Sequence, residues 1–163
     1  MKIDAFGSGL ELHRTGERAR DFASIGYDGL WLAEAGRTAY LSCAAAALAA
    51  PELDIGTAVA TAFPRSPMVT AQIAWELAEA TRGRFILGLG TQIKAHIERR
   101  FSTVYDHPGA RLREYVLAHS AKILHEVCTC DINVLASFFF AGWLLSARWP
   151  CTRNQPTECL SEP

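Results

Sequence analysis

Apolar residues along the chain gather into four short runs, each separated from the next by a stretch with helical spacing. The runs occupy residues 3–6, 28–34, 53–60 and 84–90. The last run, Arg-Phe-Ile-Leu-Gly-Leu-Gly, is apolar or glycine at both sets of alternate positions, which is typical of a strand buried on both faces. Residues 53–60 alternate, with markedly small side chains on one face. We therefore predict four strands.

The stretches between these runs predict one helix each. Thr15 is placed to cap the first helix and Gly26 to end it. Thr38 is placed to open an alanine-rich second helix that stops at Pro51. A cap residue followed by proline, Ser66-Pro67, is a strong start for the third. From the spacing, the residues expected to face inward are Ala19, Phe22 and Ala23, then Leu41, Ala45 and Leu48, then Val69, Ile73, Leu77 and Ala80.

Two further helical patterns follow the fourth run. Ile93, Ile97 and Phe101 lie at helical spacing, and Lys94 and Glu98 lie four residues apart. A longer helix begins at Pro108, and its expected inner stripe is Leu112, Val116, Ile123 and Val127. Strand and helix thus alternate four times at intervals of roughly 25 to 30 residues, about the length of one βα unit. The pattern predicts an α/β fold with parallel strands and crossover helices.

Composition narrows the functional class. With 163 residues, half of them apolar, and a net charge of −1, the chain is suited to one sizeable core and is not a natural polyanion binder, so we expect no nucleic-acid partner. An acid-containing strand pattern starts directly after Met1, which predicts a cytoplasmic protein. Four of the five cysteines lie after residue 127, at spacings that fit neither a disulfide framework nor a zinc site. No metal site is predicted.

Several motifs in the same order resemble one known family. They are GYDGLW at 26–31, LDIGTAV at 53–59, FPRSP at 63–67 and GRFILGLG at 83–90. Together they resemble the luciferase-like monooxygenase family, and TQIKAHIERRF at 91–101 resembles its branch that uses the deazaflavin coenzyme F420. The resemblance implies a (β/α)8 TIM barrel that binds a flavin or deazaflavin at the carboxyl ends of its strands. Residues 1–118, about four βα units, correspond to its first half.

The resemblance implies roles for residues after the second, third and fourth strands. Glu34 follows the second strand, where family members place a polar residue at the cofactor ring, and a carboxylate there is suited to holding the ring or moving a proton. The alternative is an exposed loop acid paired with Arg37. Ala58 and Val59 match a bulge in the family's third strand, often with a cis peptide, that supports the face of the ring. Small side chains there also suit a narrow barrel interior.

The segment after the fourth strand completes the predicted site. Gly88, Gly90 and Thr91 match family positions beside the ring. Glycine at a strand end admits either a ligand or another backbone. The remaining predicted site residues are Arg65 and Lys94 for an anionic substrate and His96 as an acid/base group, while Arg99 and Arg100 are read as a solvated helix face. Gln92 and Ile93 stand where some deazaflavin-dependent relatives carry a proton-donating carboxylate, so the acid is not identified.

The implied reaction is hydride transfer between C5 of the deazaflavin and a small organic substrate. With FMN as the cofactor, the family's alternative outcome is oxygen insertion through a flavin peroxide. A different class of function also fits the sequence: a non-catalytic half-barrel that acts as a binding or structural protein, as a homo-oligomer or paired with another half.

The pattern changes after residue 118. Residues 132–147 form an uncharged run with three consecutive phenylalanines, shorter than the roughly 20 residues needed to span a bilayer. A membrane anchor there is the weaker alternative. Residues 148–163, rich in Pro, Thr and Cys, are predicted to be unstructured. We interpret residues 119–163 as an unmatched tail that arises from a shifted reading frame or a truncated gene product, which would leave the enzyme inactive.

Overall fold

The computed structural model describes residues 1–126, 133–137 and 144–148, with side chains described up to residue 118. The strands are β1 (Asp4–Ser8), β2 (Gly29–Ala33), β3 (Asp54–Thr57), β4 (Ala60–Thr61), β5 (Phe85–Gly90), β6 (Asn133–Ser137) and β7 (Leu144–Arg148). The helices are α1 (Leu12–Ile25), α2 (Ala39–Ala49), α3 (Pro67–Ala80), α4 (Lys94–Phe101) and α5 (Pro108–Glu126). Four successive βα units are therefore present, as the sequence predicted.

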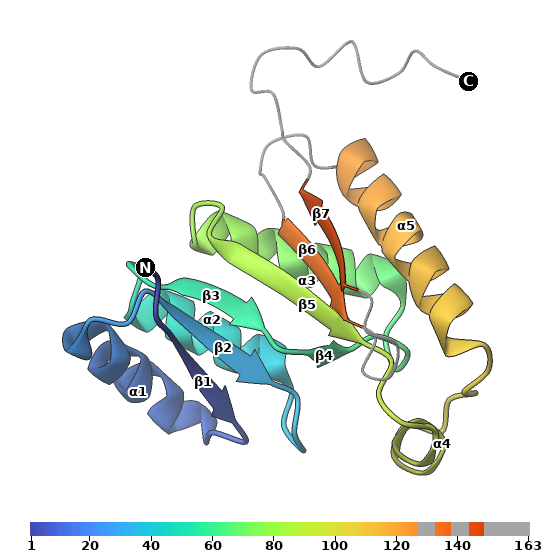
Figure 1. Cartoon of the computed structure of the whole chain (residues 1–163), viewed down its shortest axis with the longest axis horizontal. Coiled ribbons are helices and arrows are strands. Elements are labelled where there is room, and N and C mark those ends of the chain that lie inside the picture. Colours follow the sequence, from blue (N-terminus) through green and yellow to red (C-terminus); the bar gives the residue numbers. More distant parts are fainter. Residues whose placement is uncertain (127–132, 138–143, 149–163) are drawn as a thin grey trace.

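These strands form one sheet in the order β1-β2-β3-β5-β6-β7, with β4 paired to β5. All of these pairings are parallel except that of β6 with β7. Helices α1, α2, α3 and α5 flank the sheet, and α4 lies beyond the carboxyl end of β5 (Figure 1). This is the α/β arrangement expected for the first half of a (β/α)8 barrel.

Side chains alternate between the two faces of the sheet. Ala5, Leu30, Ile55 and Phe85 lie side by side across four strands, and all are at most 5 % exposed. The neighbouring row faces the other way, toward what is the interior in a closed barrel. In that row Phe6 is 63 % exposed, and the Trp31 ring occupies the space in which a side chain at position 56 would lie, since a Cβ on Gly56 would be 2.5 Å from the ring. The hydrophobic core thus lies between sheet and helices, and the inner face is exposed at Phe6 and half-buried at Trp31 and Ile86.

The predicted start of the first helix was wrong. Helix α1 begins at Leu12 with Glu11 as its N-cap, and Thr15 lies inside it with its hydroxyl donating to the Glu11 carbonyl at 3.0 Å. Threonine occurs both as an N-cap and inside helices, where its hydroxyl bonds to a carbonyl four residues earlier. The sequence alone does not distinguish these two positions. The other signals were right. Gly26 ends α1 with φ at 97°, Thr38 precedes α2, and the Ser66 hydroxyl accepts the Val69 N–H at 3.3 Å.

The predicted inner faces of α2 and α3 were wrong in part. Leu41 and Leu48 are 56 % and 79 % exposed, and Val69 is 45 % exposed. Small residues face inward instead: Cys43, Ala46 and Ala47 in α2, and Ala71, Ala74 and Ala78 beside Leu77 in α3. For α2 the reason is close packing against α1, because a Cβ on Gly16 of α1 would lie 3.1 Å from the Ala49 Cβ of α2. Alanine permits that approach and leucine does not.

Both later helices are present, although Ile93 precedes α4 as its N-cap and is 43 % exposed. Ile97 and Leu112 are fully buried, and Val116 packs against the core. Lys94 pairs with Glu98 at 3.8 Å. The side chain of Ile123 and the whole of Val127 lie outside the described part of the chain.

The predicted tail contains two strands among its described residues. Strands β6 and β7 lie inside or at the edge of the uncharged run 132–147, and β6 continues the parallel sheet beside β5. Of the segment predicted to be unstructured, residues 149–163 lie outside the described residues. Within the described part of the chain, no helix is long and apolar enough to cross a membrane.

Cys43 gives the core a pH dependence. Burial raises the pKa of its thiol to about 12, well above that of an exposed cysteine. Above pH 9 the unfolded chain releases this proton and the folded chain keeps it, so the free energy of unfolding should fall by about 1.4 kcal/mol per pH unit between pH 9 and 12. Chemical denaturation under reducing conditions at several pH values measures this slope. In Cys43→Ala the slope should be shallower, and an unchanged slope would contradict the assignment.

Candidate functional site

Glu34, which is buried, and Arg65, which is partly buried, form an ion pair at the carboxyl ends of the strands. Glu34 directly follows β2, and its side chain is 7 % exposed. Its Oε1 accepts from an Arg65 nitrogen at 2.5 Å, and its Oε2 accepts from the other Arg65 nitrogen at 3.0 Å and from the Thr61 N–H at 2.7 Å. The alternative of an exposed loop acid paired with Arg37 is therefore wrong. Arg37 was suggested as the partner because it is close in sequence. The parallel sheet instead places Arg65, from the next βα unit, beside Glu34.

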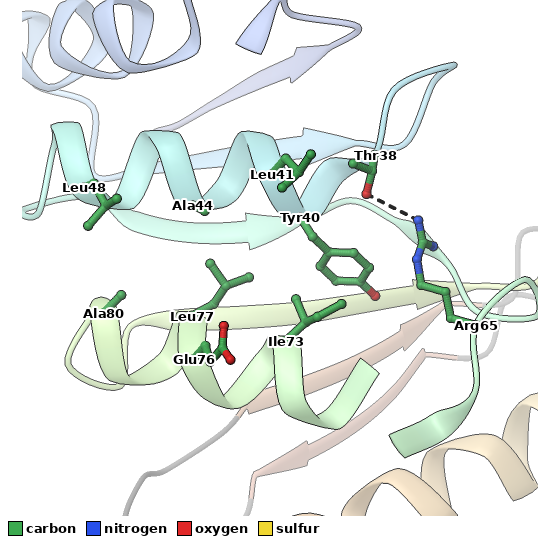
Figure 2. Close-up of a pocket in the computed structure, with 10 residues that line it drawn as sticks. All are labelled: Thr38, Tyr40, Leu41, Ala44, Leu48, Arg65, Ile73, Glu76, Leu77 and Ala80. Atoms are coloured by element: carbon green, nitrogen blue, oxygen red, sulfur yellow. Dashed lines mark hydrogen bonds between the residues drawn. The ribbon is translucent and has the colours of Figure 1, made fainter. Parts of the chain in front are cut away.

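Arg65 has further partners on its outer side. It also donates to the Thr61 carbonyl at 2.9 Å and the Thr38 hydroxyl at 3.3 Å, and its guanidinium lies 4.9 Å from the Tyr40 ring centroid (Figure 2). Burial works against the charge on Arg65, but the hydrogen bond and attraction of Glu34 outweigh it, and the net effect raises its pKa. With most of its donors engaged, Arg65 contributes to this site by holding Glu34, and direct contact with a substrate stays a prediction.

The third predicted strand breaks just before this ion pair. Gly56 pairs with Ile86 and Ala60 with Leu89, so four steps on one strand oppose three on β5, which is a bulge of one residue. The bulge contains the cis peptide between Ala58 and Val59, at the position that the family resemblance implied. The Ala58 N–H still donates to the Leu32 carbonyl at 3.0 Å. The small, half-buried segment Ala58–Val59 therefore lies between the ends of β2 and β5.

Thr57 replaces the missing ladder bonds at the bulge. Its hydroxyl donates to the Gly88 carbonyl at 2.7 Å and accepts the Gly88 N–H at 2.8 Å. A Cβ on Gly88 would lie 2.0 Å from the Thr57 carbonyl oxygen. Of the two interpretations of this glycine, close approach of another backbone is therefore the one that the structure shows. Thr57 was not singled out from sequence, although a buried threonine in an apolar strand is a signal for such a bond.

The residues after β5 are held by their own polar contacts. Gly90 pairs with Thr61, and Thr91 is 7 % exposed. Gln92 has a positive φ of 58°, and its carbonyl accepts from the Tyr105 hydroxyl at 3.0 Å. These contacts fix the start of the loop that leads into α4. The structure thus brings together Glu34, the Ala58–Val59 segment, Gly88, Gly90 and Thr91.

Lys94 and His96 are not joined to this cluster. Lys94 lies on α4 with its side chain 67 % exposed and paired to Glu98. His96 is half-buried, and its buried Nδ1 has no hydrogen-bond partner within the described part of the chain. Neither residue forms a described ion pair or hydrogen bond with Glu34 or Arg65, so their assigned roles stay predictions.

The fold and these motifs match a known family. The model of the luciferase-like monooxygenase family matches residues 3–125, and the chain belongs to that family. Among curated proteins, it is 44 % identical over 108 residues to the uncharacterized protein Rv1360 of Mycobacterium tuberculosis and equally to Mb1395 of Mycobacterium bovis. The match covers 66 % of this chain and 32 % of either relative, so the chain spans about a third of their length.

Solved structures share the fold at low identity. The oxygenating constituent of 3,6-diketocamphane monooxygenase from Pseudomonas putida, in complex with FMN, superposes with a TM-score of 0.65 at 16 % identity over 92 % of this chain and 45 % of its own. An F420-dependent secondary alcohol dehydrogenase with an F420-acetone adduct gives a TM-score of 0.63 at 20 % identity over 77 % and 42 %. The described fold is therefore the N-terminal half of a luciferase-like TIM barrel.

The bulge provides a stability test. Thr57→Val keeps the side-chain shape but leaves the Gly88 N–H and carbonyl without their partner, so it should lower the free energy of unfolding by about 2 kcal/mol. Thr81→Val is the matched control, because Thr81 is also buried but its hydroxyl donates to the Leu77 carbonyl, which the Thr81 N–H already satisfies. Urea denaturation of both variants checks this. An equal decrease in the free energy of unfolding for the two variants would show that the Thr57–Gly88 hydrogen bonds do not stabilise the fold more than the Thr81 hydroxyl does.

Proposed function

We propose that this chain provides the N-terminal half of a coenzyme F420 site in an oxidoreductase of the luciferase-like family. The reaction is hydride transfer between the deazaflavin and a small organic substrate. The observation that carries the proposal is the meeting of the Glu34–Arg65 pair with the Ala58–Val59 segment and Gly90 at the carboxyl ends of neighbouring parallel strands. Active sites of (β/α)8 barrels lie at this end.

The residues present suit a flat, polar-edged ring. Ala58 and Val59 are small and half-buried, so a ring can pack against them without displacing large side chains. Glu34 already accepts three hydrogen bonds, and its Oε1, with one partner, keeps capacity for a ring N–H. When bound, the deazaflavin supplies C5 as the hydride donor or acceptor. Glu34 orients its edge, and Arg65 fixes Glu34.

The acid/base role falls to another residue. A carboxylate clamped between a guanidinium and a backbone N–H is better suited to holding a group than to exchanging protons. His96 is the candidate, because a neutral imidazole carries both a proton donor and a proton acceptor, and its Nδ1 lacks a partner among the described residues.

FMN-dependent oxygenation is the second candidate. The FMN-bound diketocamphane monooxygenase supports it, since its superposition extends over 92 % of this chain. The segment 91–101 supports F420 instead, because it resembles the deazaflavin-dependent branch. A direct comparison of the two cofactors separates these candidates.

A chimera tests the proposal. Residues 1–125 of this chain are joined to the remaining C-terminal part of Rv1360, which supplies the further strands. The chimera should bind F420, and Glu34→Gln should weaken binding by about 10- to 100-fold through loss of one charge-assisted hydrogen bond. Glu79→Gln, at an exposed position of α3, is the matched control and should bind like the parent. Fluorescence titration with F420 and with FMN measures both.

Each outcome of this titration decides something. Preferential FMN binding would favour the second candidate. A folded chimera that binds neither cofactor would contradict the proposal and favour the non-catalytic half-barrel.

The 163-residue chain itself should show no turnover, because β1 and β7 are the ends of the described sheet and the face carrying Phe6 is open to water. Multiple turnovers by this chain alone would contradict the interpretation of it as half an enzyme.

A further inference from the structure

The segment between helices α4 and α5, residues 102–107, turns sharply at both of its ends. Ser102 and His107 have φ of 51° and 38°, a left-handed conformation that residues other than glycine seldom adopt. Between them, Val104 is 71 % exposed. Tyr105, by contrast, is partly buried and packs against the hydrophobic core. The segment therefore directs one aromatic side chain inward.

The Tyr105 hydroxyl reaches the residues that follow β5. It donates to the Gln92 carbonyl at 3.0 Å, and the Thr91 hydroxyl donates to the same carbonyl at 3.1 Å. Both lone pairs of that oxygen therefore have a partner, and the Thr91 hydroxyl keeps the capacity to accept from a ligand N–H. Gln92 itself is left-handed, with φ at 58°. A conformation of this kind persists only where the surrounding structure holds it, and the Tyr105 hydroxyl is one of the contacts that do so.

The Tyr105 ring reaches a second segment at the strand ends. It packs edge-on against the buried Phe63, with the ring centroids 6.1 Å apart. The Arg111 guanidinium lies 4.5 Å from the centroid of the Phe63 ring. Arg111 also donates to the Val104 carbonyl, so it joins the residue before Tyr105 to the same ring. Phe63 lies two residues before Arg65 in the chain.

We propose that Tyr105 is a positioning residue of the candidate cofactor site. Its hydroxyl acts through Gln92 on Thr91, and its ring acts through Phe63 on the segment that carries Arg65. One side chain thus holds together the segments that follow β4 and β5, and the predicted cofactor contacts come from both. This inference rests on the function proposed above.

Hydrogen–deuterium exchange of the 163-residue chain tests these contacts without any cofactor. Tyr105→Phe keeps the ring against Phe63 but removes the hydrogen bond to Gln92. The amides of residues 91–97 should then exchange about tenfold faster, whereas those of helix α1 should keep the parent rate. A role limited to overall stability would raise exchange in both regions. Tyr27→Phe is the matched control, because it removes a hydroxyl at the amino end of β2, and it should leave residues 91–97 unchanged.

Cofactor affinity tests the consequence for the site. In the chimera with the C-terminal part of Rv1360, Tyr105→Phe should raise the Kd for the cofactor that binds, F420 or FMN, by about tenfold. Tyr105→Leu also loses the ring contact with Phe63 and should bind still more weakly. Tyr27→Phe should bind like the parent.

Two results would overturn the proposal. One is exchange at residues 91–97 that Tyr105→Phe leaves unchanged or raises no more than in α1. The other is an unchanged Kd for Tyr105→Phe in a chimera that binds a cofactor. A chimera that binds neither cofactor would contradict the proposed function, while the exchange pattern would still decide whether Tyr105 holds residues 91–97 in place.

Discussion

The site depends on one largely buried ion pair, Glu34 with Arg65. Glu34 follows strand β2 in the second βα unit, and Arg65 precedes helix α3 in the third, so their bond joins two successive units. Thr61 joins the same cluster from β4, through its N–H to Glu34 and its carbonyl to Arg65. A charge buried without a partner is costly, so each member needs the others in place. The ends of β2 and β4 and the start of α3 are thereby fixed together.

The bulge beside this ion pair solves a packing problem. Strand β5 runs straight from Phe85 to Gly90, whereas the neighbouring strand must gain one residue between Gly56 and Ala60. Only glycine fits at position 88, because the Thr57 carbonyl occupies the place of a Cβ. The Thr57 hydroxyl then satisfies the Gly88 backbone groups that the bulge leaves without ladder partners. The segment that would face a cofactor is held by backbone and hydroxyl contacts rather than by large side chains.

The sequence predicted the order of elements well because that order depends on local signals. Proline after serine, glycine in the left-handed region and short apolar runs each act within a few residues, and Ser66, Gly26 and strand β5 all lie where expected. The inner faces of α2 and α3 depend instead on how closely two helices approach. Tertiary packing places alanine at the contact and leucine outside. Helical spacing alone predicts that the larger residue faces the core. Local signals also explain why the sequence suggested Arg37, three residues away, as the ion-pair partner of Glu34.

Part of the candidate site could be predicted from the sequence, and part depends on contacts between distant residues. The positions of Glu34, Ala58, Val59, Gly88 and Gly90 at the strand ends follow from the family resemblance and from the parallel fold. The contacts of Glu34 with Arg65, of Thr57 with Gly88 and of Arg65 with Tyr40 join residues that lie 25 to 31 positions apart in the chain, about the length of one βα unit. The spacing of apolar residues along the chain does not predict such contacts.

A double-mutant cycle on Glu34 and Arg65 tests the central role of their ion pair most directly. Glu34→Gln and Arg65→Met are made singly and together, and the free energy of unfolding is measured for each by urea denaturation. Each single variant leaves the other charge buried without its partner, so each should be strongly destabilising, and the double variant should lose much less than the sum. We predict a coupling of about 2 kcal/mol, in the range found for residues in one network. Additive losses, with a coupling below about 0.5 kcal/mol, would show that the ion pair does not hold the strand ends together.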